Sequence, residues 1–428
     1  MTAELSLART RSPRFHPASL DALNFLLADV RGALGPYLNV FLVTQQQWSQ
    51  SSVGLVTTVS GILGLVVQTP IGAAIDATRA KRLLVVAALA VLAAGAAAIY
   101  ALPLFWPVLI ANTAMAMVGD VFGPAVAALT LGLYGRTGLA RRLGRNSAFD
   151  HAGNVAIAAA AGAVGWLFAQ RAVFLLVPVF AVFAALAVLS IPAGAIDHER
   201  ARGGEHEPGS SVDAPAGLGI LFTCRPLLIY AACAFCFHFA NAPLLPLVGQ
   251  KLAIAHQSLA TPMMSSCIIA AQLIMLPIAL AVGRSADRIG RKPILLIGFA
   301  VLPIRALLYT ASDNAAWLIG VQLLDGVGAG IFGAITPLVI ADLMRGTGRY
   351  NLAQGAVATA QGIGASLSGL AAGVTVDRLG YGAAFTGAAV VAAIALAALA
   401  LAMPETRQRG LTTSDGRSGS QVSGIGTS

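Results

Sequence analysis

The chain has 428 residues and a formal net charge of +9, with 57% hydrophobic residues and only 11% charged ones. Soluble globular domains carry roughly 25% charged residues, so this composition excludes an ordinary soluble protein. The basic residues are divided among several short polar segments instead of forming one patch, which argues against a nucleic-acid partner.

Twelve apolar segments follow one another along the chain, each long enough to cross a hydrocarbon core of roughly 30 Å as an α-helix. They are 20–44, 52–75, 83–103, 107–134, 147–169, 172–193, 220–248, 259–282, 293–312, 315–341, 353–376 and 382–403. We therefore predict an all-α membrane protein of twelve transmembrane helices in two halves of six. The lipid bilayer is its first expected partner, and no cleavable signal peptide is expected ahead of the first helix.

Polar segments divide the chain into an N-terminal arm, a first half, a linker rich in Gly, Pro and Ser, a second half, and a tail that we expect to be disordered. The boundaries are 1–19, 20–193, 194–219, 220–403 and 404–428. Most of the 27 Lys and Arg residues lie on the side of the arm, the linker and the tail, while the opposite loops carry only Arg171, Lys251 and Arg378. The positive-inside rule then predicts cytoplasmic termini and a place in the cytoplasmic (inner) membrane.

A charged motif, G-x-x-x-D-R-x-G-R-K, lies between the second and third predicted helices of the second half. It consists of Gly283, Asp287, Arg288, Gly290, Arg291 and Lys292. A degraded copy, 211 residues upstream, retains Gly72, Asp76 and Lys81. The same offset, within one residue, aligns 121–123 with 331–333 and aligns Leu34 and Pro36 with Leu244 and Pro246. One register across several helices indicates a duplicated six-helix unit.

The motif and its echo resemble the loop between helices 2 and 3 in each half of the major facilitator superfamily. This resemblance implies secondary transport of a small-molecule substrate by alternating access, with the loop latching the two halves on the cytoplasmic side. The first copy, which has Ala77, Arg79 and Ala80 at motif positions, should be the weaker latch. For Arg284, Arg291 and Lys292, simple positive-inside anchoring is the alternative interpretation.

Ionisable residues at membrane depth carry most of the functional information, because each costs several kcal/mol unless it faces protein or water. There are six of them: Asp29, Arg31, Asp120, His238, Arg305 and Asp325. Five lie on predicted helices 1, 4, 7 and 10, which line the central cavity in the superfamily that the chain resembles. Asn24, Arg31 and Asn39 form a polar stripe on helix 1 at helical spacing. The substrate-cavity candidates are Asn24, Arg31, Asn39, Asn112, Asn241 and Gln322.

Depth along the helices suggests that Arg31 pairs with Asp120 and that Arg305 pairs with Asp325 across a helical hairpin. Such pairs either hold helices together or take part in transport. Three carboxylates face two arginines, so one Asp is left without a counter-ion, and low dielectric would favour its protonated form. The proton-coupling candidates are Asp29, then Asp120, with His238 and Asp325 as further members of a relay.

Asp29 stands seven residues ahead of Pro36, which resembles the coupling acid of drug and proton antiporters. Two departures from that group leave the direction of transport open: Asn112 occupies the place of its helix 4 arginine, and Trp166 follows the helix 5 glycines where proline is usual. A proton-coupled exporter of a small organic molecule is the leading hypothesis. The alternatives are an importer of an anionic metabolite, with Arg31 and His238 as counter-charges, and a non-transporting sensor or enzyme.

The remaining chemistry-bearing residues give no sign of a cofactor. Cys233-x-x-Cys236 is interpreted as packing on helix 7 and not as a metal or redox site. Gly326-x-Gly328-x-Gly330 lacks the strand and turn of a dinucleotide fingerprint. We therefore expect no cofactor, no metal and no enzymatic activity, protons as the energy source, and a monomer.

Overall fold

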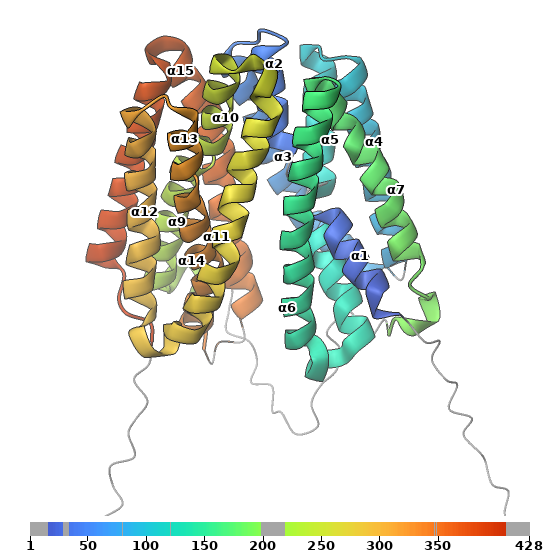
Figure 1. Ribbon diagram of the computed structural model, residues 1–428. Coiled ribbons are helices and arrows are strands. Elements are labelled where there is room, and N and C mark those ends of the chain that lie inside the picture. The colour runs from blue at the N-terminus through green and yellow to red at the C-terminus, as the bar shows by residue number, and fades with distance from the viewer. Residues whose placement is uncertain are drawn as a thin grey trace, which may run out of the picture.

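This computed structural model describes residues 16–28, 34–78, 80–119, 121–197, 219–345, 347 and 349–407. Within them, all regular structure is helical (Figure 1). The first half contains α1 (Pro17–Leu27), α2 (Leu34–Thr44), α3 (Gln50–Ala77), α4 (Lys81–Ala101), α5 (Phe105–Gly119), α6 (Phe122–Leu167), the 3-10 turn η1 (Gln170–Leu175) and α7 (Leu176–Leu189). The second half contains α8 (Ile220–Thr223), α9 (Arg225–Asn241), α10 (Leu244–Ala255), α11 (Ala260–Ile289), α12 (Arg291–Ala311), α13 (Ala315–Val321), α14 (Leu323–Leu343) and α15 (Tyr350–Ala402).

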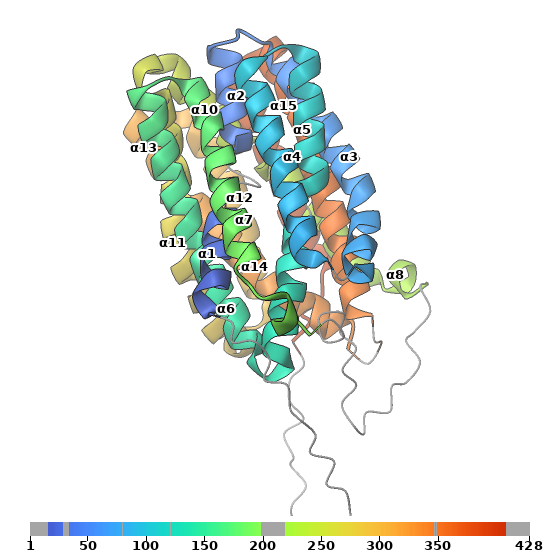
Figure 2. The same ribbon diagram turned by 90° about the vertical axis from the view of Figure 1, so that its right-hand side faces the viewer.

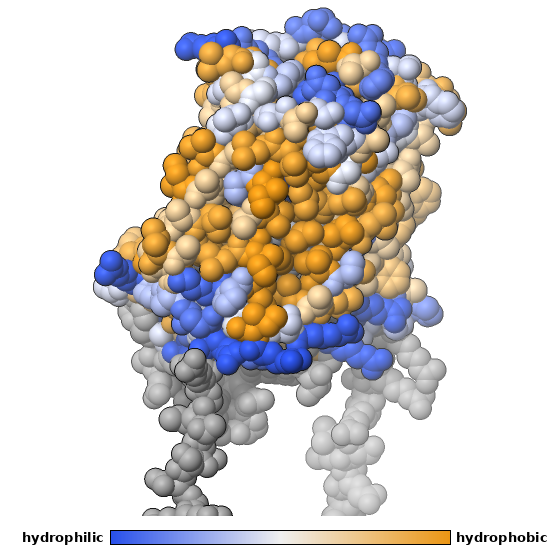
Figure 3. Space-filling view, turned by 60° about the vertical axis from the view of Figure 1, so that its left-hand side comes forward, coloured by the Kyte–Doolittle hydropathy of each residue, from blue (hydrophilic) through white to orange (hydrophobic). Residues whose placement is uncertain are grey.

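The helices are long and apolar enough for a membrane. Nine stretches within the described ranges meet the length and hydropathy expected of a membrane span. Helix α15 turns at Gly380, where φ is 82°, and so provides two passes, while α1 with α2 and the second arm of α6 supply the predicted segments 20–44 and 147–169. Every predicted segment is thus represented by helix, and a broad apolar band covers the surface between two polar ends (Figure 3). The all-α membrane fold class is confirmed.

The duplication is visible in the helix boundaries. Helices α2, α3, α4 and α5 begin at residues 34, 50, 81 and 105, and α10, α11, α12 and α13 begin at residues 244, 260, 291 and 315. The offset is 210 residues in each case. It places Lys81 opposite Arg291, the first residues of α4 and α12, and not opposite Lys292 as the 211-residue offset suggests.

The segment predicted as helix 7 from residue 220 is divided into two helices at its start. The short α8 ends at Thr223, and the membrane helix α9 begins only at Arg225, with a proline in its first turn. Pro226 fits this position because the first turn of a helix has no partner for a proline's missing N–H. Helix α8 projects from the bundle near the end where α1 begins and α15 finishes (Figure 2). We call this the tail end, and we call the opposite end, where α2 leads into α3, the far end.

Three apolar clusters hold the bundle together. One lies wholly within residues 20–196 and a second wholly within residues 227–403, so each half has its own core. The third joins Tyr37, Val40 and Ala158 of the first half to Ala253 and Met264 of the second. Helix α3 packs along α15, α6 along α11, and α2 along α10. Two self-contained halves with a limited shared interface can move relative to each other as units.

Candidate functional site

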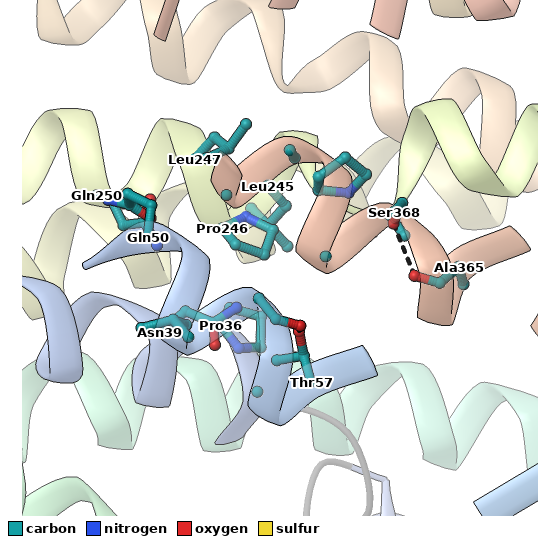
Figure 4. Close-up of a pocket in the computed structure, with 18 of the residues that line it drawn as sticks. Pro36, Asn39, Gln50, Thr57, Leu245, Pro246, Leu247, Gln250, Ala365 and Ser368 are labelled. Carbon is teal, nitrogen blue, oxygen red and sulfur yellow. Dashed lines mark hydrogen bonds between the residues drawn. The ribbon is translucent and has the colours of Figure 1, made fainter. Parts of the chain in front are cut away.

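A cavity of about 320 Å³ lies between the two halves, closer to the far end than to the tail end. Helices α2 and α3 form its wall in the first half, and α10, α14 and α15 form most of its wall in the second. Figure 4 shows side chains from both halves around it. Its polar lining consists of Asn39, Gln50, Thr57, Asn241, Gln250, Asp325 and Ser368.

Polar groups lie at this depth where successive helices meet. Asn241 is the last residue of α9, two residues before Pro243, which precedes α10. Gln322 separates α13 from α14, and Asp325 lies in the first turn of α14. The residues at both junctions, Ala242, Pro243 and Gln322, keep helical backbone angles, so each pair of helices forms one membrane span.

A buried network centres on Arg305 of α12, whose side chain is 2% exposed. Its guanidinium forms an ion pair with Asp325 and donates to Asn241 Oδ1 at 2.7 Å. Gln322 Nε2 donates to the second oxygen of Asp325 at 2.9 Å, and Tyr309 donates its hydroxyl proton to Gln322 Oε1. Asp325 faces the cavity while Arg305 lies behind it. The network therefore places a carboxylate at the cavity wall with its counter-ion buried in the second half.

The far end is closed by contacts between the halves. Asp377 of α15 accepts the backbone N–H groups of Gln50 at 3.0 Å and Ser51 at 2.8 Å, which start α3. A carboxylate at a helix N-terminus both satisfies free N–H groups and complements the helix dipole. Below it, the backbones approach so closely that a Cβ on Gly54 would overlap the carbonyl of Gly369. Gln50 lines both the central cavity and a polar recess of about 380 Å³ at the far end, so it lies in the seal between them.

The tail end holds a second cavity between the halves, of about 560 Å³. Its wall includes Asn24 of α1, Asn146 and Asp150 of α6, Pro337 of α14 and Gln354 of α15. The two halves are thus joined at the far end and separated by a cavity at the tail end. This arrangement is one of the two expected of a protein that exposes a central site alternately to each side.

The chain matches the family model described as Major Facilitator Superfamily over residues 20–278 and 227–423. It belongs to the Major Facilitator Superfamily. Two similar relatives are the uncharacterized MFS-type transporters MT2531 and Rv2456c of Mycobacterium tuberculosis, strains CDC 1551 and H37Rv. Each is 49% identical over 391 residues, which cover 91% of this chain and 93% of the relative.

Solved structures share the fold at low sequence identity. The nucleoside transporter NupG matches with a TM-score of 0.68 and 12% identity, over 90% of this chain and 98% of that one. A D-xylose-proton symporter matches with a TM-score of 0.69 and 14% identity, over 91% and 97%. As a member of the Major Facilitator Superfamily, the chain is a multi-pass membrane transporter and not an enzyme.

The helix 1 stripe predicted for this MFS transporter is divided between two places. Asn39 lines the central cavity, but Asn24 donates to the Leu20 carbonyl at 2.7 Å and lines the tail-end cavity. Residues 29–33 between α1 and α2 lie outside the described part, so the single polar face stays a prediction. Asn112 on α5 lies outside the lining of both cavities.

His238 is not among the residues that line either cavity. Its Nδ1 is 3.0 Å from the carbonyl oxygen of Ala234, one turn earlier, and its ring packs against Phe237 and Phe332 with centroids 5.6 and 4.9 Å away. Asp29, Arg31 and Asp120, the other deep charges, lie outside the described residues. The predicted pair of Arg31 with Asp120 is likewise outside them.

The complete copy of the charged motif is held within the second half. Arg291 binds Asp287 at 2.7 Å, Asp342 of α14 at 3.0 Å and the Ala286 carbonyl at 2.8 Å. Gly290 lies between α11 and α12 with φ 108°, a conformation that favours glycine. Among the described residues, the side-chain contacts of the motif that the structure gives stay inside this half, and the latch to the other half stays a prediction.

Other motif residues form hydrogen bonds with the C-terminal end of α15 and the residues that follow it. Lys292 Nζ donates to the Ala400 carbonyl at 2.8 Å, and the Arg288 carbonyl accepts from Arg407 at 2.5 Å. Gly283 lies within α11. In the first copy, Lys81 is 1% exposed, whereas the side chains of Gly72 and Asp76 lie outside the described part.

Sequence reasoning missed several polar contacts. Asp21 of α1 pairs with Arg142 at 2.6 Å and Arg145 at 2.7 Å on α6 beside the tail-end cavity. His151 Nδ1 lies 2.9 Å from Gln272 Oε1 across the two halves. Arg142 and Arg145 count as topology signals in the sequence, and no local pattern relates them to Asp21. A comparison of the depths of charged residues on α1 and α6 would have been the signal for this pairing.

Proposed function

We propose that this transporter moves a small organic solute by alternating access and couples that movement to protons through Asp325 and Arg305. The observation that carries the proposal is the position of this pair, with the carboxylate at the cavity wall and the guanidinium buried behind it. A solute or a proton that enters the cavity meets the carboxylate first.

Protonation of Asp325 would remove the counter-ion of a buried arginine. Breaking a buried ion pair on one side costs about 3–5 kcal/mol, so the protonated state is accessible only if another change compensates for it. Arg305 also binds Asn241, at the break between α9 and α10. Loss of the ion pair would thus alter the anchoring of α10, which packs against α2 of the other half. The Arg305 side chain therefore links proton binding at Asp325 to the interface between the halves.

The physiological direction that we propose is export from the cytoplasm, supported by the position of Asp29 ahead of Pro36. Asp29 and Asp120 stay proton-coupling predictions beside Asp325. We also propose, from the distribution of Lys and Arg, that the tail end is cytoplasmic, that the protein lies in the cytoplasmic membrane, and that it acts as a monomer. In that orientation the tail-end cavity opens inward.

The test is a flux measurement in proteoliposomes that contain a trapped pH dye, with a solute that stabilises the purified protein. We expect solute added on one side to move protons in the opposite direction. Asp325→Asn should retain solute exchange between equal pools but lose proton movement. Asp313→Asn, which removes an 83% exposed carboxylate that pairs with Lys251 at the far end, serves as the matched control. Proton movement that persists in Asp325→Asn contradicts the assignment, and movement in the same direction as the solute contradicts export.

A further inference from the structure

Two amide side chains in the central cavity have oxygen atoms without partners. Asn39 Oδ1 and Gln250 Oε1 are buried and accept no hydrogen bond from the described residues, although both residues line the cavity. Gln250 is only 2% exposed. A buried acceptor without a donor is costly, and native structures retain few of them. The two amides lie on α2 and α10, in opposite halves, so one molecule between them would contact both.

Two hydroxyl groups of the lining add acceptors, while the Asn241 amide, whose oxygen accepts from Arg305, keeps its NH2 group as a donor. The hydroxyl protons of Thr57 and Ser368 are donated to the carbonyls of Gly54 at 3.0 Å and Ala365 at 2.7 Å in their own helices. Each hydroxyl oxygen therefore presents lone pairs to the cavity. Asp325 adds a carboxylate, and among the described lining residues it is the only one with a charged side chain.

The apolar part of the lining consists of aliphatic residues. Among the described lining residues, Pro36, Val53, Leu245, Pro246 and Leu247 supply this surface, and none of the described lining residues is aromatic. Such a wall accommodates the carbon skeleton of a small molecule but offers no ring on which a flat base can stack. Complementarity therefore requires several N–H or O–H donors on a compact aliphatic frame.

We infer that the transported solute is a small aliphatic molecule without a negative charge that carries at least two hydroxyl or amino donors, and that Asn39 and Gln250 select it from opposite halves of the cavity. This inference rests on the proposed transport function. It identifies the chemical class of the solute and makes the two amides specificity-determining residues.

The test is thermal unfolding of the purified full-length protein in detergent at fixed pH. The probes are ribitol and glycerol, compared with their carboxylate counterparts ribonate and glycerate at the same millimolar concentration. We expect at least one donor-rich probe to raise the melting temperature and its matched acid to leave it unchanged. Stabilisation by the acids alone, or by none of the probes, would overturn the inference.

Variants show whether the amides are responsible. Asn39→Leu and Gln250→Leu should each weaken probe binding at least tenfold. Asn39→Asp, which retains an acceptor oxygen, should bind as the wild type does. Thr386→Val, at an exposed position on α15, is the control for a neutral change elsewhere. Equal losses in Asn39→Asp and Asn39→Leu would show that the acceptor is not what matters, and unchanged binding in both leucine variants would exclude the two amides as selectors.

The two proposals fail separately. If a donor-rich probe binds and is transported but no proton moves, the coupling proposal fails and the solute class stands. If an acid is transported with protons through Asp325, the solute class fails and the coupling stands.

Discussion

The two halves share one helical frame but differ at the positions of the buried ion pair. Arg305 and Asp325 of the second half correspond, 210 residues earlier, to Gly95 and Met115 of the first. There the Met115 side chain packs so tightly against Gly95 that a Cβ would have no room. The same frame therefore closes around a small residue and a thioether in one half and around two charges in the other. Since the fold does not require the charges, the comparison favours a role in transport over a purely structural role.

The largest expected effect comes from replacing Arg305 and Asp325 by the residues found at the corresponding positions of the first half. Asp325→Met alone leaves Arg305 buried without a counter-ion and should destabilise the protein by about 3–5 kcal/mol. The double variant Arg305→Gly with Asp325→Met restores the packing seen in the first half and should regain at least half of that loss. Thermal unfolding of the detergent-purified variants measures both. A double variant as unstable as the single one would mean that the second half depends on its ion pair for folding.

The next effect concerns the far-end seal, where the halves also differ. The position that corresponds to Asp377 is Leu167, which is 65% exposed and caps no helix. Asp377→Ala should remove the cap of α3, worth about 1 kcal/mol, and shift the population toward a far-end-open arrangement by roughly fivefold. Labelling of a cysteine introduced at Thr57, inside the seal, by a membrane-impermeant thiol reagent should become faster. An unchanged labelling rate would show that close packing such as that of Gly54 on Gly369 is sufficient for closure.

A comparable effect is expected at the paired helix starts, Lys81 and Arg291. Arg291 bonds two carboxylates and a backbone carbonyl at once, which a lysine cannot reproduce with the same geometry. Arg291→Lys should therefore cost about 1–2 kcal/mol of stability. In the first half, by contrast, a lysine occupies the corresponding buried position, since Lys81 is 1% exposed. Equal melting temperatures for wild type and Arg291→Lys would contradict this asymmetry.

The smallest effect is a pH dependence at Glu405, after the last helix. Burial alone would raise the pKa of this carboxyl, but hydrogen bonds from the backbone N–H groups of Arg407, Arg291 and Lys292 outweigh it and lower the pKa below the ordinary 4.5. The stabilisation is therefore complete above the ordinary pKa and is lost as pH falls through the lowered one. Melting temperatures of wild type and Glu405→Gln should differ at neutral pH and converge in acid. A constant difference over that range would exclude the carboxylate as the cause.

Much of the fold follows directly from the sequence. Apolar segments of membrane length and a constant repeat offset are enough to predict the helices and the two halves. Depth along neighbouring helices also predicts that Arg305 reaches Asp325, because a short turn leaves little freedom in their relative position.

The site is less predictable because it depends on where helices break and which face turns inward. Helical spacing predicts Asn24 and Asn39 on one stripe but does not predict that they line different cavities. His238 lies on a predicted cavity helix but packs against Phe237 and Phe332, and nothing local to its segment specifies that packing. Glu405 falls in the predicted tail, since its partners at Arg291 and Lys292 are more than a hundred residues away.

The most direct test of the central claim is infrared difference spectroscopy of the protein in lipid, recorded as a stabilising solute is added at constant pH. The account predicts a change in the protonated-carboxyl band that is present in the wild type and in Asp313→Asn and absent in Asp325→Asn. A band that persists in Asp325→Asn, or that disappears only in Asp29→Asn or Asp120→Asn, would show that the proton is carried elsewhere and would contradict the account.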